Sequence, residues 1–141
     1  MRKRTRSREL ALQILYQADI RHEDIKSILS DFWKSQSQSS EELEPSIMEF
    51  AENLAQGTQE NIKQIDTTIS SYAQNWQLER MAVIDRNIMR MSCYELLFLD
   101  DVPPKVSINE AVDLAKKYGD LESGKFVNGI LDKINKKEIS K

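Results

Sequence analysis

Apolar residues recur at helical spacing along most of this chain, most clearly from Met81 to Leu99, where neither proline nor glycine interrupts. At 100° per residue, Ile84, Ile88 and Met91 fall on one side of a helix, and a second apolar set follows about a third of a turn further round. A helix that is apolar over so much of its circumference is usually buried among other helices. The pattern therefore predicts one long central helix around which the rest of the chain packs.

Charged residues are embedded in this apolar segment. Glu95 lies on the same side as Ile84 and Ile88, and a buried carboxylate needs a charged or hydrogen-bonding partner. Arg86 and Arg90, one turn apart, could supply it. We interpret the three charged residues as an ion network that sets the register of the helix. A catalytic role for Glu95 is disfavoured, because no second catalytic group lies near it in sequence.

The same spacing predicts about seven helices in all. Gly57 either ends the third helix or breaks it, and Ser107 with Glu110 has the spacing of a capping box, which would open the helix after the two prolines. Residues 35–44 are predicted to form a solvated loop, and residues 135–141 a frayed tail. The other helices are expected at about residues 5–19, 23–34, 45–57, 62–72, 107–118 and 123–134.

The composition supports one all-α domain. The chain has 141 residues, is 40% hydrophobic, and contains only four glycines and three prolines. Its one cysteine, Cys93, excludes an internal disulfide and a cysteine-rich zinc site, which fits a reducing cytoplasm. With a single histidine and no glycine-rich phosphate loop, we expect no metal, no cofactor and no catalysis. No signal peptide or membrane-spanning segment is evident.

The net charge of −3 is unevenly distributed. The first eight residues carry five positive charges and no acid, so the remaining residues carry a net −8. This basic N-terminal segment, called the basic head below, precedes an acidic remainder of the chain. The contrast predicts a local anion-binding site, with nucleic acid as the obvious partner. The alternative is a charged terminus that binds nothing. The five basic residues are Arg2, Lys3, Arg4, Arg6 and Arg8.

Two aromatic residues are candidates for stacking on bases. The face of the first helix opposite its apolar stripe carries Arg6, Glu9, Gln13 and Tyr16. A tyrosine ring can stack on a base, an amide can read a base edge, and a guanidinium can meet a phosphate. Alternatively, Tyr16 covers a neighbouring helix with its hydroxyl in water. Phe126, at the edge of the last apolar stripe and beside lysines, is either a half-buried core residue or a stacking platform, and spacing alone favours the core.

Four stretches together resemble the NusB family. They occur in order from Arg8 to Asp132, whereas residues 20–78 match only in pattern. Each stretch is weak alone, but the four together are highly specific. They are RELALQILY at 8–16, DRN and YEL at 85–87 and 94–96, VP and VSINEA at 102–103 and 106–111, and FVNGILD at 126–132.

The resemblance implies a bacterial transcription antitermination factor, built from seven helices in two packed subdomains. Such a protein binds the boxA element of nascent RNA together with NusE, a protein of the small ribosomal subunit. The complex joins an antitermination assembly on RNA polymerase, chiefly in ribosomal RNA operons. The alternative is a helical interaction module or homodimer without RNA binding, which would not need a basic head beside an exposed tyrosine.

The resemblance also implies which residues meet each partner. Asp85 is a candidate contact for NusE, whose surface is expected along the fourth to sixth helices. The resemblance also favours base stacking for Phe126. The RNA-facing positions are the basic head with Arg2, Lys3, Arg4, Arg6 and Arg8, then Gln13, Tyr16, Tyr72, Glu122, Ser123, Lys125 and Phe126.

Overall fold

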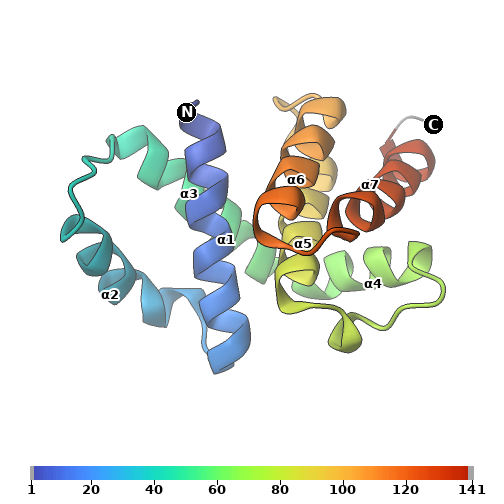
Figure 1. Cartoon of the computed structure of the whole chain (residues 1–141), viewed down its shortest axis with the longest axis horizontal. Helices are drawn as coiled ribbons and strands as arrows, with labels where there is room; N and C mark the ends of the chain where they lie inside the picture. The colour runs from blue at the N-terminus through green and yellow to red at the C-terminus, as the bar shows by residue number, and fades with distance from the viewer. Residues whose placement is uncertain (1, 140–141) are drawn as a thin grey trace. The chain divides into compact units, whose positions relative to one another are not determined.

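The computed structural model describes residues 2–139, which form seven α-helices and contain no strand (Figure 1). The predicted all-α fold is therefore confirmed. The chain divides into two compact units, residues 1–60 and residues 61–141. Across residues 2–139, no helix is both long and apolar enough to cross a membrane.

The first unit contains α1 (Lys3–Arg21), α2 (Ile25–Ser37) and α3 (Pro45–Glu60). Helix α1 packs against both α2 and α3, and Leu10, Ile14 and Leu54 are fully buried between them. Helix α1 ends at Arg21, and the C-cap residue His22 adopts the left-handed conformation with φ of 55° and donates its backbone N–H to the carbonyl of Ala18. This tight end turns the chain into α2.

Two boundaries in this unit differ from the sequence prediction. Helix α1 begins at Lys3 rather than near Thr5, so all the basic residues of the head except Arg2, which precedes the helix, lie in its first two turns. Helix α3 continues through Gly57 to Glu60. An isolated glycine costs a helix only about 1 kcal/mol relative to alanine, and the buried position of Gly57 shows that close packing surrounds it.

The second unit is arranged around α5. Helices α4, α6 and α7 all contact it, and Ile88, Met89, Met91 and Cys93 are fully buried. The prediction of a buried central helix is confirmed within this unit. The elements are α4 (Ile62–Tyr72), the 3₁₀ turn η1 (Leu78–Arg80), α5 (Val83–Phe98), α6 (Pro104–Tyr118), α7 (Ser123–Ile134) and the π-helical turn η2 (Asn135–Ile139).

The predicted capping box at Ser107 is wrong. Helix α6 begins at Pro104, a residue that suits the first helical position because its fixed φ is already helical. Ser107 therefore lies inside the helix, and its hydroxyl donates a 2.9 Å hydrogen bond to Oε1 of Glu95. Residues 135–139 form η2, and the predicted fraying of the tail stays a prediction. Ser140 and Lys141 lie outside the described residues.

The charged residues of α5 connect it to its neighbours. Glu95 is 1% exposed, as predicted. Arg90 forms a bidentate pair with Asp66 of α4, with Nε–Oδ1 and Nη2–Oδ2 distances of 2.8 and 2.9 Å. Arg86 donates to the carbonyl of Leu78 at 3.1 Å. Both arginines thus attach α5 to preceding segments, whereas their predicted direct pairing with Glu95 stays a prediction.

Candidate nucleic-acid interface

The first turn of α1 forms a basic surface in the first unit. Lys3 and Arg4 are exposed there, as is Arg2 immediately before the helix, and the turn contains no acidic residue. The guanidinium of Arg4 lies 4.3 Å from the centre of the Phe50 ring, which holds it in place. These charges add to the positive end of the helix dipole, so the turn is suited to bind an anion.

A cavity of about 360 Å³ adjoins this turn. Besides the two cations Lys3 and Arg4, polar groups of Ser46 and Asn53 line it, together with one acid, Glu49. Lys3 also lies 2.7 Å from Glu44, but both side chains are more than half exposed. An ion pair between such exposed groups is weak, and an incoming phosphate can therefore displace it.

Glu9 of the predicted outward face and Arg8 of the basic head are both buried. Glu9 is 4% exposed, and Arg8 is 2% exposed with its guanidinium 5.7 Å from the Phe50 ring centre. The predicted outward position of Glu9 is therefore wrong, because every position from Ser7 to Leu12 of α1 is buried. The RNA-facing role predicted for Arg8 stays a prediction. Arg6 is partly exposed and forms ion pairs with Glu41 at 2.7 Å and with Glu9 at 3.3 Å.

Gln13 and Tyr16 are exposed, as predicted. They are three residues apart on α1 and therefore neighbours on one helix face. The Tyr16 side chain is 37% exposed, so most of its area packs on the unit while the rest of the ring remains accessible. The first unit thus offers an aromatic ring and an amide on the helix whose first turn is basic.

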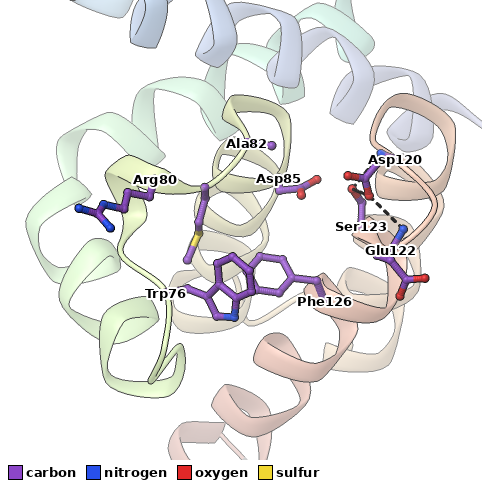
Figure 2. A pocket seen from close by; sticks show the side chains of 9 residues that line it. Trp76, Arg80, Ala82, Asp85, Asp120, Glu122, Ser123 and Phe126 are labelled. Atoms are coloured by element: carbon purple, nitrogen blue, oxygen red, sulfur yellow. Dashed lines mark hydrogen bonds between the residues drawn. The ribbon is translucent and has the colours of Figure 1, made fainter.

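The second unit contains a cavity of about 230 Å³ (Figure 2). Its walls come from the connection between α4 and α5, the start of α5, the connection between α6 and α7, and α7 itself. Its opposite sides differ in chemistry, one being aromatic and the other acidic. The lining residues are Trp76, Arg80, Met81, Ala82, Asp85, Asp120, Glu122, Ser123 and Phe126.

The aromatic side consists of Trp76 and Phe126. Their ring centres lie 5.3 Å apart with an angle of 69° between the planes, which is a favourable edge-to-face contact. Phe126 is partly buried, consistent with its predicted edge position. Trp76 is 56% exposed, and sequence reasoning missed it. A tryptophan within the polar segment YAQNWQLER was the available signal.

The acidic side is centred on Asp85, which is 7% exposed. Its Oδ1 has no hydrogen-bond partner among the residues that the structure describes. Burial raises the pKa of the Asp85 carboxyl, the nearby Asp120 charge adds to the rise, and a hydrogen bond with Ser123 opposes it. Figure 2 shows the carboxyl turned toward Ser123 and Asp120. Asp85 thus faces the cavity rather than an open helix face, and its predicted contact with NusE stays a prediction.

The connection between α6 and α7 is held by its own hydrogen bonds. Asp120 donates its N–H to the Ser123 hydroxyl at 3.0 Å, and its Oδ1 accepts from that hydroxyl at 3.2 Å and from the Glu122 N–H at 2.9 Å. A Cβ on Gly119 would lie 2.4 Å from the Ser123 oxygen. Glycine at 119 therefore permits the close turn that brings Asp120, Glu122 and Ser123 to the cavity.

Two further predicted RNA-facing residues lie outside this cavity lining. The Tyr72 hydroxyl donates a 2.7 Å hydrogen bond to Glu138 of η2. Lys125 is exposed on α7, immediately before Phe126. The structure thus brings Glu122, Ser123 and Phe126 together at one cavity and leaves Tyr72 and Lys125 elsewhere on the unit.

We expect Asp85→Asn to raise the melting temperature at neutral pH, because it removes a buried charge without changing side-chain shape. The folded-state pKa of Asp85 is raised, so this carboxyl lowers stability above that pKa and ceases to do so once it is protonated. The advantage of the variant should therefore shrink as the pH falls through the raised pKa. Thermal melts of both proteins across pH 4–8 measure this. A variant that is less stable at pH 7 would contradict the expectation.

The structure bears on two kinds of reactive site within residues 2–139, a nucleophilic thiol and a metal centre. Burial raises the pKa of the Cys93 thiol to about 12, so the thiol stays protonated at neutral pH and is a poor nucleophile. Within residues 2–139, no three histidine, cysteine, aspartate or glutamate side chains are grouped so as to hold a metal ion.

Comparison with known proteins identifies relatives along nearly the whole chain. The NusB family model matches residues 5–136. The transcription antitermination protein NusB of Anaeromyxobacter sp. (strain Fw109-5) is 52% identical over 132 residues, covering 94% of this chain and 89% of that protein. The NusB protein of Thermodesulfovibrio yellowstonii is 44% identical, covering 97% and 94% respectively.

Solved structures agree with these matches. NusB of T. maritima superposes with a TM-score of 0.84 at 41% identity, covering 95% of this chain and 91% of that one. A chain from the crystal structure of the antitermination factors NusB and NusE in complex with double-stranded RNA gives a TM-score of 0.82 at 31% identity, covering 96% and 98%.

Proposed function

Because this chain belongs to the NusB family of transcription antitermination proteins, we propose that it binds boxA-type single-stranded RNA together with NusE. The complex would join the antitermination assembly on RNA polymerase in the cytoplasm, chiefly during transcription of ribosomal RNA operons. The protein acts as a binding factor and not as an enzyme.

The basic first turn of α1 carries this proposal. It offers three exposed cations at the positive end of a helix, and the same helix exposes Gln13 and Tyr16. Such a combination supplies both the electrostatic and the stacking contacts that single-stranded RNA uses. The crystal structure of antitermination factors NusB and NusE in complex with double-stranded RNA, which contains a chain similar to this one, supports the choice of partners.

A titration tests the proposal directly. A boxA-type RNA and a scrambled RNA of equal length should each be titrated with the protein, with and without NusE, at several salt concentrations. We expect tighter binding of the boxA sequence and a further gain with NusE. Equal and weak binding of both RNAs under all conditions would favour the alternative, a helical interaction module or homodimer that does not bind RNA.

Neutralising the first turn of α1 should weaken RNA binding and its salt dependence. In the variant Arg2→Gln/Lys3→Gln/Arg4→Gln, the slope of log affinity against log salt should flatten by about 0.7 for each phosphate contact that is lost. Affinity should fall about equally for all RNA sequences, because phosphate contacts carry no sequence information. Titrations from 50 to 300 mM salt provide the measurement.

The matched control removes positive charges elsewhere in the same unit. Lys26 and Lys34 are exposed on α2, and the variant Lys26→Gln/Lys34→Gln should leave the slope nearly unchanged. If both variants flatten the slope equally for each charge removed, the effect comes from overall charge. The first turn of α1 would then not be a phosphate-binding site.

A further inference from the structure

We propose that residues 41–44 form an acidic strap, which competes with RNA phosphates for cations of the basic head and so weakens RNA binding until the strap is displaced. The strap has the sequence EELE and belongs to the connection between α2 and α3 (Figure 1). This inference rests on the proposed RNA-binding function and adds an autoinhibitory contact to it.

Arg6 is the cation that the strap engages most completely. Its Nη2 donates to Oε1 of Glu41 at 2.7 Å and its Nε donates to Oε2 at 3.1 Å, while Nη1 donates to Glu9 at 3.3 Å. A phosphate binds arginine through a pair of such N–H groups, because two of its oxygens match the guanidinium fork. Since carboxylates occupy all three nitrogens, Arg6 can bind a phosphate in this way only after Glu41 has left.

A second contact joins the strap to the first turn of α1. The Nζ of Lys3 lies 2.7 Å from Oε2 of Glu44. The strap therefore pairs with two cations of the basic head, one at each end of its four residues. Three of these four residues are glutamates and none is basic, so the strap offers the head the same sign of charge as a short run of phosphates.

The strap is held by these ion pairs more than by packing. Its three glutamates are exposed, and only Leu43 is partly buried. A cavity of about 540 Å³ lies against the strap, and Glu41, Glu42 and Leu43 line it together with Trp33 and Met48. The strap thus leaves space beside it unfilled. A segment with few buried apolar contacts opens at a low free-energy cost, so RNA can displace the strap without unfolding the helices.

The competition is reversible because each contact is weak. The hydrogen bond from Arg6 holds the pKa of the Glu41 carboxyl below its usual range, so the carboxylate stays charged at neutral pH. Ion pairs between exposed groups nevertheless contribute little individually. A strand that brings several phosphates at once can replace two carboxylates, whereas a single small anion cannot, because it gains only one contact.

The strap should lower the affinity for every RNA sequence by about the same factor, because phosphate contacts carry no sequence information. An RNA that also gains base contacts on the exposed face of α1, at Gln13 and Tyr16, still binds. An RNA that is held by phosphate contacts alone falls below the working concentration of the protein. The strap would thus limit occupation of the basic head by unrelated RNA.

The test removes both carboxylates without changing side-chain size. The variant Glu41→Gln/Glu44→Gln and the wild type should each be titrated with a boxA-type RNA and a scrambled RNA of equal length, at 50 to 300 mM salt. The matched control is Glu23→Gln/Asp31→Asn, which removes two exposed acids of the same unit. Glu23 follows the opposite end of α1, about 30 Å along the helix from Lys3.

We expect Glu41→Gln/Glu44→Gln to bind both RNAs about fivefold more tightly than the wild type at 50 mM salt. The control should change either affinity less than twofold. The gain should shrink toward one at 300 mM salt, because salt screens the exposed ion pairs that the variant lacks. Thermal melts should show that both variants are folded, since all four substituted side chains are exposed.

A double-mutant cycle separates the contact from overall charge. Arg6→Gln alone should weaken RNA binding. Adding Glu41→Gln to it should give no further gain, because the carboxylate then has no guanidinium to occupy. An effect of overall charge would instead give the same gain in both backgrounds, and that result would overturn the proposed role of the contact between Arg6 and Glu41.

Three further outcomes would contradict the strap. Unchanged affinity in Glu41→Gln/Glu44→Gln, while the wild type binds boxA RNA, would show that the carboxylates do not compete, although the proposed function would survive. Weaker binding in this variant would show that they position the cations for RNA. An equal gain in the control would assign the effect to net charge. If neither the wild type nor the variant binds any RNA, the proposed function itself is refuted.

Discussion

Replacing Glu95 with alanine should lower the free energy of unfolding by about 2–4 kcal/mol. The side chain is 1% exposed and accepts a hydrogen bond from the Ser107 hydroxyl across the contact between α5 and α6. A hydrogen bond to a charged group contributes about 1.5–3 kcal/mol, and the one buried methylene that alanine lacks adds about 0.8 kcal/mol. For a protein of this size, the melting temperature should fall by about 10 °C. Chemical denaturation and thermal melts measure the change.

Two conservative variants separate the charge of Glu95 from its packing. Glu95→Gln keeps the volume and one acceptor oxygen, so its loss should be clearly smaller. Ser107→Ala removes the donor alone, and a double-mutant cycle with Glu95→Gln would give the coupling between the two side chains. RNA affinity of the folded fraction should not change in any of these variants. Normal melting of Glu95→Ala combined with lost RNA binding would show that Glu95 is a binding residue and not a structural one.

Replacing Tyr16 with alanine should weaken RNA binding by about 1–3 kcal/mol, which is about fivefold to 150-fold. The ring is 37% exposed on α1, so the variant should lose little stability compared with removal of a fully buried aromatic residue, which costs about 3–5 kcal/mol. Tyr16→Phe keeps the stacking surface and should bind nearly as well as the wild type. A Tyr16→Ala protein that binds boxA RNA at full strength would remove the ring from the proposed site.

Phe126 offers a contrasting case in the second unit, because it is partly buried and contacts Trp76. Phe126→Ala should lower both stability and RNA affinity, since the ring supports the cavity wall as well as facing it. The lost edge-to-face contact alone accounts for about 0.5–1.5 kcal/mol of stability. Thermal melting and RNA titration on the same samples separate the two effects. A loss confined to stability would identify Phe126 as a core residue, as its spacing alone had favoured.

Local patterns in the sequence were sufficient to predict the helical architecture and the exposure of two candidate site residues. Apolar spacing located the central helix and predicted that Glu95 would be buried within it. It also predicted that Gln13 and Tyr16 would face outward, and both are exposed. These conclusions depend on which face of a single helix is apolar, and that property is encoded by residues three and four positions apart.

Other features depend on how the helices pack and could not be predicted from local patterns. Ser107 was expected to cap a helix, but its hydroxyl instead donates a hydrogen bond to Glu95. Arg90 pairs with Asp66, which lies on another helix. The cavity likewise joins Asp85 with Trp76 from the preceding connection and with Glu122 and Phe126, about forty residues further along the chain. Periodicity shows that a side chain points inward, but not which distant group it meets, because that depends on how helices pack across long sequence separations.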